Sequence, residues 1–262
     1  MVSSTTEKLL VETVKNTVVV TIKNPPANTW DEESLTGLKQ LVGDCEADSG
    51  VYALVFVGQG EKFFSAGADL NIFAPGDPVV ARNMAENFGG AFETLANFRG
   101  VTIAAINGFA MGGGLECALA CDIRIAEEQA QMALPEATVG LLPCGGGTQN
   151  LAWTVGEGWA KRMILCGERI NAETGVSIGL VEEVVATGQA RTRALELAAA
   201  VGKQSPPAVA ACKSLIQSAR SGNIAGAYTV ERDKFVGLFD TNDQSEGVNA
   251  FLEKRAPQWT NS

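Results

Sequence analysis

The segment from residue 101 to residue 121, VTIAAINGFAMGGGLECALAC, constrains the fold of this chain more than any other. It is long enough to span a bilayer, but Asn107, Glu116 and four glycines interrupt its apolar character. A carboxylate at the centre of a membrane helix costs roughly 2.5–3.5 kcal/mol on insertion scales, which argues against a lipid environment. We therefore expect a buried strand that leads through the glycines into a buried helix.

The first two thirds of the chain alternate between strand and helix patterns, which predicts an α/β fold. Residues 8–14 and 17–23 alternate in polarity and are rich in β-branched residues, so we expect two strands there. Asp31 is the expected N-cap of a helix over 32–46 that has a leucine face. The other expected elements are strands at 51–57, 101–106, 122–126 and 181–185, and helices at 78–98 and 112–120.

The last third is predicted to be mostly helical. The pattern turns helical after Pro143, and the C-terminal part is expected to hold three or four helices, the last capped by Asn242-Asp243. A chain of 262 residues fits one large α/β domain with appendages or two small domains, and we place the division between 1–200 and 201–262. Short terminal helices can hardly bury all their apolar side chains alone, which predicts self-association through Phe235, Val236, Leu238, Phe239, Val248, Phe251 and Leu252.

Composition excludes several classes of function. The chain carries 20 basic and 30 acidic residues, a net charge of −10, which disfavours nucleic acids and anionic membranes as partners. It contains no histidine, which removes Ser-His-Asp and Cys-His triads, His-ligated zinc and any histidine base. Any chemistry must therefore rely on carboxylates, backbone dipoles, Lys, Tyr, Ser or Cys, and we expect no metal and no resident cofactor.

The six cysteines indicate a reducing compartment. They are scattered and form no C-x-x-C pair, whereas secreted disulfide frameworks are usually denser and occur in shorter chains. The N-terminal residues also lack the charged and apolar regions of a secretory signal peptide. We expect a cytoplasmic protein whose thiols are buried and reduced.

Glycines mark the first candidate site. Eight of the 29 glycines lie between residues 108 and 147, and Gly112-Gly113-Gly114 follow an expected buried strand and open an expected helix. Backbone N–H groups and the positive end of the helix dipole converge at such a position, which favours an anion. The sequence matches neither of the usual glycine-rich nucleotide motifs. The alternative is that the three glycines only allow tight packing of strand against helix.

Two carboxylates in apolar surroundings mark the second candidate site. Glu116 lies on an otherwise apolar helix, and Glu136 is the only charged residue from 129 to 156. Burial raises the pKa of an unpaired carboxyl, so each is a candidate general acid or base. The alternative is that each pairs with a buried arginine or caps a helix. Two acids beside backbone N–H donors suit proton transfer next to a thioester carbonyl, through an enolate that the amides hold.

Five segments of the chain carry recognisable motifs. They are FSAGADL (64–70), AAINGFAMGGGLECALACDIRIA (104–126), LPEATVGLLPCGGGTQNL (134–151), GERINAETGVSIGLVEEVV (167–185) and SEGVNAFLEKRAP (245–257). In this order they resemble the enoyl-CoA hydratase/isomerase (crotonase) superfamily over nearly the whole chain. The resemblance implies a spiral of ββα units, a C-terminal helical region for trimerisation, a coenzyme A thioester as substrate, and a homotrimer or a dimer of trimers.

The resemblance also implies roles by position. Ala68 and Gly113 match the two residues whose amides form an oxyanion hole. Glu116 matches the glutamate that activates water, and Glu136 matches the glutamate that gives or takes the α-carbon proton. The residues expected to contact the acyl-CoA are Ala66, Gly67, Ala68, Asp69, Leu70, Gly112, Gly113, Pro135, Leu142, Cys144, Phe251 and Lys254. The last two have an alternative reading as a trimer-packing aromatic and a solvated charge.

The presence of both glutamates resembles the hydratases, so water addition to a trans-2-enoyl-CoA is the leading expectation. The alternatives are a Δ3,Δ2-enoyl-CoA isomerase, another crotonase-type reaction, or a non-catalytic acyl-CoA-binding relative. Three positions depart from the common hydratase pattern and leave the acyl specificity open. Cys144 replaces a usual glycine, Asn150 replaces a usual arginine, and Trp30 replaces a small residue near the acyl and coenzyme A region.

Overall fold

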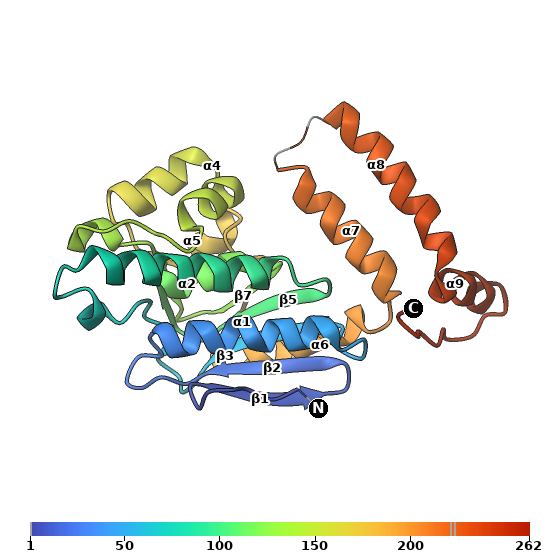
Figure 1. Ribbon diagram of the computed structural model, residues 1–262, viewed down its shortest axis with the longest axis horizontal. Coiled ribbons are helices and arrows are strands. Elements are labelled where there is room, and N and C mark those ends of the chain that lie inside the picture. Colours follow the sequence, from blue (N-terminus) through green and yellow to red (C-terminus); the bar gives the residue numbers. More distant parts are fainter. Residues whose placement is uncertain (1, 221, 223) are drawn as a thin grey trace.

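The computed structural model describes residues 2–220, 222 and 224–262. Its centre is a six-stranded sheet in the order β1-β2-β3-β5-β7-β10, in which β1 runs antiparallel to β2 and the other neighbours run parallel (Figure 1). The strands are β1 (Leu9–Val14), β2 (Thr17–Ile22), β3 (Ala53–Gly58), β5 (Val101–Ile106), β7 (Ile123–Glu127) and β10 (Glu183–Val185). The sheet confirms the α/β fold that the alternating patterns predict.

Helices cover both faces of this sheet, because the central strands carry apolar side chains on both faces. On β3, Leu54 and Phe56 belong to the core cluster that includes α1 (Glu32–Ala47) and α2 (Pro78–Ala96). Val55 and its neighbours at alternate positions pack instead with α6 (Ala190–Val201). Such two-sided burial is typical of parallel strands that lie between layers of helices.

The helix predicted after Asp31 is confirmed together with its cap. Ser34 N donates to Asp31 Oδ1 and Asp31 N donates to Ser34 Oγ, both at 2.9 Å, so the two residues form a reciprocal capping box at the start of α1. α2 begins in a similar way, with Asp77 as N-cap and Pro78 in the first turn. These two helices lie side by side over the sheet (Figure 1).

A second, smaller sheet contains β4 (Phe63–Ser65), β6 (Phe109–Met111), β8 (Gln131–Ala133) and β9 (Ile170–Asn171). The first three are parallel and β9 is antiparallel to β8. The sequence patterns do not predict these strands, because two or three residues are too few to show an alternation. β6 shows that the apolar segment 101–121 forms strand, short strand and helix rather than one strand and one helix.

Shorter helical elements surround the small sheet. α3 (Gly113–Ala120) is buried along its whole length, and two 3-10 helices, η1 (Leu70–Ile72) and η2 (Glu136–Val139), follow β4 and β8. α4 (Gly147–Leu165) is kinked at Gly156, whose φ of 77° and ψ of 160° are not helical. α5 (Ala172–Ser177) connects β9 to the segment that leads into β10.

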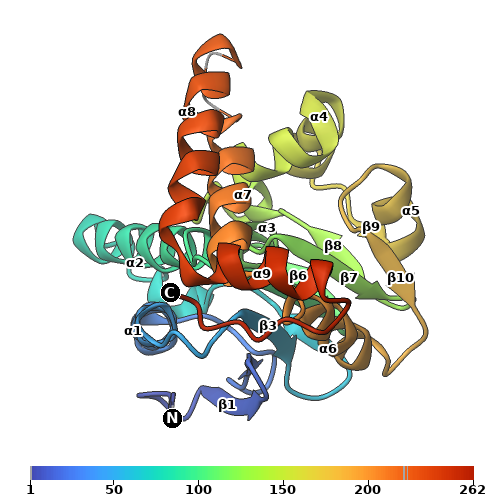
Figure 2. The ribbon, with the colours of Figure 1, turned by 90° about the vertical axis from the view of Figure 1, so that its right-hand side faces the viewer.

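The C-terminal helices form an arm that extends away from the two sheets. The arm consists of α7 (Pro206–Ser218), α8 (Ile224–Gly237), the 3-10 helix η3 (Leu238–Asp240) and α9 (Asn242–Leu252), as Figures 1 and 2 show. Lys213 on α7 donates to Asp122 Oδ2 at 2.8 Å and to the carbonyl of Gly100 at 3.0 Å, which ties the arm to the ends of β5 and α3.

Two expectations need comment. The predicted cap of the last helix is wrong by one residue: Thr241 is the N-cap and accepts from Gln244 N, because the Asp243 carboxylate is turned toward the chain end instead. Asp243 accepts from the backbone N–H groups of Thr260 and Asn261.

In the part of the chain that the structure describes, no helix combines the length and apolar character needed to cross a bilayer.

Candidate active site

Three parallel strands of the small sheet deliver residues to one cavity. β4 is followed directly by Ala66, β6 by Gly112, and β8 shortly afterwards by Glu136. Open sheets commonly bind ligands at the carboxyl ends of parallel strands. A cavity lies at the same ends of the short strands in this sheet. The cavity measures about 280 Å³ and is lined by Ala66, Ala68, Leu70, Phe73, Phe88, Met111, Gly112, Gly113, Glu116, Pro135, Glu136, Thr138, Val139, Leu141, Leu142 and Cys144.

The amide of Ala68 is directed by strand-like pairing with Trp30. Trp30 N donates to Gly67 O at 2.8 Å and Asp69 N donates to Trp30 O at 3.0 Å, so Ala68 is bridged in parallel to Trp30. In such a bridge the groups of the two flanking residues face the partner, and those of the central residue face the opposite way. The N–H of Ala68 therefore points away from Trp30, on the side where the cavity lies.

The amide of Gly113 approaches the same point from α3. Gly113 is the first residue of that helix, so its N–H has no partner within the helix and lies at the positive end of the dipole. Gly67 packs against this helix start with a φ of 91°, and a Cβ on Gly67 would lie 3.1 Å from Gly113 N. Glycine at 67 thus allows the two donor segments to approach each other closely. Two N–H donors that approach from separate segments in this way make a candidate oxyanion hole.

Glu116 is a buried carboxylate held by two backbone donors. Its side chain is on α3, and only 2% of its surface is exposed. Oε1 accepts from Gly145 N at 2.7 Å and from Gly147 N at 2.8 Å. Burial raises the pKa of Glu116, and the two N–H groups oppose that rise because they stabilise the ionised form. The carboxylate is therefore fixed in position while its second oxygen remains free of these donors.

Glu136 faces the cavity without such support. It is half-buried at the start of η2, and within the described residues its Oε2 is buried with no hydrogen-bond partner. Burial, together with the charge of Glu116, raises the pKa of Glu136 to about 7, although its own backbone amide opposes the shift. Two carboxyls in one cavity thus differ in environment, which separates an acid role from a base role.

Cys144 contributes a neutral thiol to the cavity wall. Burial and the nearby charges of Glu116 and Glu136 raise the pKa of Cys144 to about 11. A thiol with that pKa is protonated at neutral pH, and only the thiolate is a good nucleophile. The substitution of cysteine for glycine therefore changes the shape of the wall and adds no nucleophile.

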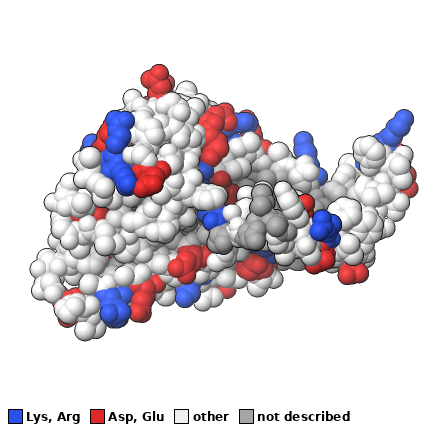
Figure 3. Space-filling model, turned by 90° about the horizontal axis from the view of Figure 1, so that it is seen from above, with Lys and Arg blue, Asp and Glu red and all other residues white. Residues whose placement is uncertain are grey.

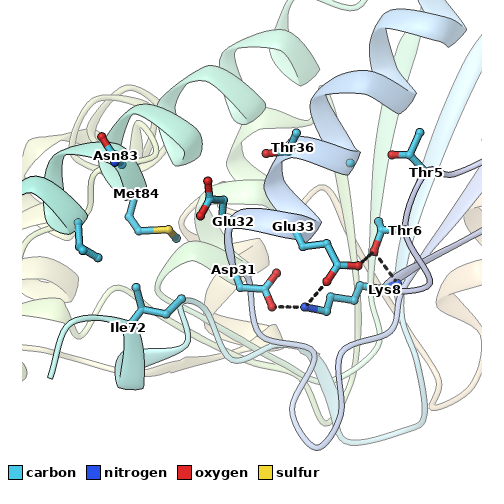
Figure 4. Close-up of a pocket in the computed structure, with 12 residues that line it drawn as sticks. Thr5, Thr6, Lys8, Asp31, Glu32, Glu33, Thr36, Ile72, Asn83 and Met84 are labelled. Carbon is cyan, nitrogen blue, oxygen red and sulfur yellow. Dashed lines mark hydrogen bonds and ion pairs between the residues drawn. The ribbon is translucent and has the colours of Figure 1, made fainter. Parts of the chain in front are cut away.

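A larger hollow lies between the chain near the N-terminus, the start of α1 and the start of α2. It measures about 680 Å³, and Figure 4 shows Lys8 pointing toward Asp31 and Glu33 on one side of it. Lys8 Nζ is 2.5 Å from Asp31 Oδ2 and 2.8 Å from Glu33 Oε2, and Thr6 donates to Glu33. Lys8 thus supports two of the carboxylates at this hollow, whereas the smaller cavity holds a carboxyl without such support and is the better candidate site.

Most residues expected to contact the substrate line the smaller cavity. Gly67 and Asp69 do not line the cavity themselves. Asp69 is the N-cap of η1, whose first residue Leu70 does line it. Phe251 lies on α9 with 83% of its surface exposed, and Lys254 just beyond it is also exposed; neither lines the cavity within one chain. Trp30 is fully buried and does not line the cavity, although its backbone pairs beside Ala68, which does. The lining residues that are absent from the expected set are Phe73, Phe88, Met111, Thr138, Val139 and Leu141.

The geometry can be compared with known proteins. A model of one family, described as enoyl-CoA hydratase/isomerase, matches residues 12–262. The chain belongs to this family. The match spans both sheets and the C-terminal arm, and it confirms the resemblance carried by the five motifs.

Relatives of known name cover almost the whole chain. The short-chain-enoyl-CoA hydratase of Clostridium acetobutylicum is 36% identical over 248 residues, 94% of this chain and 95% of that protein. The 2,3-dehydroadipyl-CoA hydratase of Escherichia coli is 36% identical over 255 residues, 96% of this chain and 98% of that protein. By their names, the first of these relatives acts on short-chain enoyl-CoA thioesters and the second on 2,3-dehydroadipyl-CoA.

Solved structures agree with the fold. The structure of Pseudomonas aeruginosa DspI is 65% identical in sequence, with a TM-score of 0.95 over 97% of each chain. The enoyl-CoA hydratase of Bacillus anthracis is 32% identical, with a TM-score of 0.94 over 98% of this chain and 100% of that one. The crotonase-type fold expected from the motifs is therefore confirmed.

Proposed function

We propose that this chain adds water across the 2,3-double bond of a trans-2-enoyl-CoA in acyl-CoA metabolism. The observation that carries the proposal is that Glu116, Glu136, Ala68 and Gly113 all line one cavity. Both an acid and a base are needed to add water, and two N–H donors suit the oxygen that becomes negative. The names of the relatives support the same reaction.

The reaction follows from these four groups. The Glu116 carboxylate takes a proton from water, and the water oxygen forms a bond to C3 of the substrate. The electrons of the double bond move onto the thioester oxygen, and the resulting enolate is held by the amides of Ala68 and Gly113. The enolate then collapses as Glu136, in its protonated form, delivers a proton to C2. The elements of one water molecule are thus added, and a proton must pass to solvent and back to reset the two carboxyls.

The cavity favours an acyl group that has no second charge. Of the residues that line it, Glu116 and Glu136 alone are charged, and both are acidic. A second carboxylate on the acyl group would enter a low-dielectric site without a cation to pair with. Leu70, Val139 and Leu142 are at least half exposed at this cavity, which provides apolar contact for a hydrocarbon chain.

We also propose that the protein assembles as a homotrimer or a dimer of trimers. The C-terminal arm exposes 62% of Phe235, 59% of Phe239 and 83% of Phe251. Figure 3 shows the arm, at the right, as largely uncharged surface with scattered charged side chains. Exposed apolar side chains gathered in this way commonly mark a protein interface. Light scattering at micromolar concentration should give a multiple of the chain mass, and a single-chain mass would refute the assembly.

Two further expectations stay proposals. Phe251 and Lys254 are proposed to contact the coenzyme A end of the substrate. A cytoplasmic location is proposed because all six cysteines are free thiols, although the expectation that they are buried is wrong for Cys144, Cys166 and Cys212, which are exposed.

The function is tested with a panel of purified thioesters. We expect crotonyl-CoA and hexenoyl-CoA to lose their conjugated absorbance in the presence of the wild-type protein, and 2,3-dehydroadipyl-CoA to react much more slowly. The matched control is the Glu116→Gln, Glu136→Gln double variant, which keeps the shape of the cavity. If all three thioesters remain unhydrated at high protein concentration, the proposed function is wrong. Isomerase activity that survives Glu116→Gln would indicate the alternative reaction, because isomerisation needs no activated water.

A further inference from the structure

Three buried aromatic rings pack against one another next to the candidate active-site cavity. Phe88 and Phe92 are four residues apart on α2 and therefore share one face of the helix. Their ring centroids are 5.7 Å apart with an interplanar angle of 70°, and Phe92 and Trp30 are 5.8 Å apart at 78°. Each ring is no more than 2% exposed. The rings therefore form one continuous edge-to-face stack, which we call the aromatic stack.

One end of the aromatic stack touches the helix start that carries an oxyanion donor. A Cβ placed on Gly113 would lie 2.7 Å from Cε1 of Phe88, so the ring rests against the α-carbon of that glycine. Phe88 also lines the cavity. Contact with this ring therefore restricts the position of the Gly113 amide.

The middle of the stack touches the loop that holds the water-activating carboxylate. A Cβ placed on Gly145 would lie 2.6 Å from Cδ2 of Phe92. Gly145 N is one of the two donors to Glu116 Oε1, at 2.7 Å. A ring of another size at position 92 would let this loop move, and the orientation of the Glu116 carboxylate would follow.

The other end carries the strand segment that aims the second oxyanion donor. Trp30 is fully buried, and its backbone N–H and C=O are the groups that pair with Gly67 and Asp69 on either side of Ala68. Within the described residues its indole N–H has no hydrogen-bond partner, so packing alone holds the ring. The large ring at this position thus has a role that a small residue could not perform.

We propose that Trp30, Phe92 and Phe88 are positioning residues that keep the amides of Ala68, Gly145 and Gly113 in mutual register. The three amides come from segments distant in sequence, and the aromatic stack is the common body against which each is packed. Misplacing a reacting or stabilising group by about 1 Å costs on the order of 10²-fold in rate. The proposal rests on the proposed function, since it assigns the register of that same site.

The test uses Trp30→Leu and Phe92→Leu, because neither ring lines the cavity. The matched control is Phe98→Leu: Phe98 is equally buried and its ring also packs on a glycine, Gly100, which contributes no amide to the cavity. All three variants lose apolar contact, so similar falls in melting temperature are expected. Thermal unfolding of each variant is measured beside its kinetics.

We expect kcat of Trp30→Leu and Phe92→Leu to fall about 10–100-fold with KM within about threefold, whereas Phe98→Leu keeps kcat within about twofold. The two stack variants should differ in which measured property changes, the pH–rate profile or the enolate absorbance. Phe92→Leu should shift the limb of the pH–rate profile that reports Glu116, because its carboxylate loses a well-placed donor. Trp30→Leu should leave that limb in place and weaken the oxyanion hole.

The oxyanion hole is read separately with acetoacetyl-CoA, whose enolate absorbs in the near ultraviolet without any turnover. We expect the wild-type protein and Phe98→Leu to enhance the enolate absorbance of bound acetoacetyl-CoA, and Trp30→Leu to lose most of that enhancement. Equal kcat losses in Phe98→Leu and the stack variants, or unchanged enolate absorbance in Trp30→Leu, would overturn the proposal. A wild-type protein that enhances enolate absorbance but hydrates nothing would contradict the proposed reaction while leaving the aromatic stack supported.

Discussion

Replacing Glu136 with glutamine should stabilise the folded protein at alkaline pH while it removes activity. The pKa of this carboxyl rises from 4.5 to about 7 on folding because burial disfavours its ionised form. The folded state therefore holds a proton between about pH 4.5 and pH 7 that the unfolded state has released, so stability decreases as pH rises through this window and is flat above it. At about 1.4 kcal/mol per pKa unit the loss is at most about 3.5 kcal/mol.

Solvent at the half-buried side chain reduces this figure, and we expect about 2 kcal/mol. Urea unfolding at fixed protein concentration and at pH 5, 6, 7 and 8 measures it. Glu136→Gln should equal the wild type near pH 5 and exceed it by about 2 kcal/mol at pH 8. Glu61→Gln, at an exposed loop position, is the matched control and should run parallel to the wild type. A Glu136→Gln profile that also runs parallel to the wild type would refute the assigned environment of Glu136.

Three further outcomes follow from the same site. Glu116→Gln keeps an oxygen that can accept from Gly145 and Gly147, so the variant should fold normally while hydration slows about 10²–10⁴-fold; an unchanged rate would remove Glu116 from the reaction. Gly113→Pro deletes an oxyanion donor at the first residue of α3, and its ring also crowds Phe88, so kcat should fall by at least about 10²–10³-fold in whatever fraction of the protein folds; near-normal turnover of the folded variant would place the oxyanion hole elsewhere. Hydration should decline above about pH 7, where Glu136 loses its proton, and dehydration of the 3-hydroxyacyl-CoA should decline below it; identical limbs in both directions would contradict the acid role of Glu136.

The main sheet could be predicted from sequence because its strands are buried on both faces. The run around Val55 is apolar at every position and ends in a glycine, which few structures other than a central parallel strand explain. The small sheet could not be predicted, since β4 and β6 have three residues each and their register is fixed by neighbouring strands. Yet it is this sheet that brings the site together.

The two glutamates were predictable because a charge isolated in an apolar segment is conspicuous. The apolar lining was not, because Met111 and Phe73 have the same appearance in the sequence whether they face a cavity or the core. Trp30 is a different case: the structure places its ring in the core, where it does not line the cavity, and its backbone pairs beside the cavity-lining Ala68. Phe251 is exposed in the single chain, so its role depends on contacts outside that chain.

The central claim is that Glu136 alone exchanges the α-carbon proton through an enolate held by the backbone amides. Butyryl-CoA incubated in D₂O tests it directly, because exchange of its C2 protons, followed by NMR, requires the enolate but no water addition. We expect exchange with the wild-type protein, measurable exchange with Glu116→Gln, and none with Glu136→Gln. Retained exchange in folded Glu136→Gln would show that another group moves the α-carbon proton.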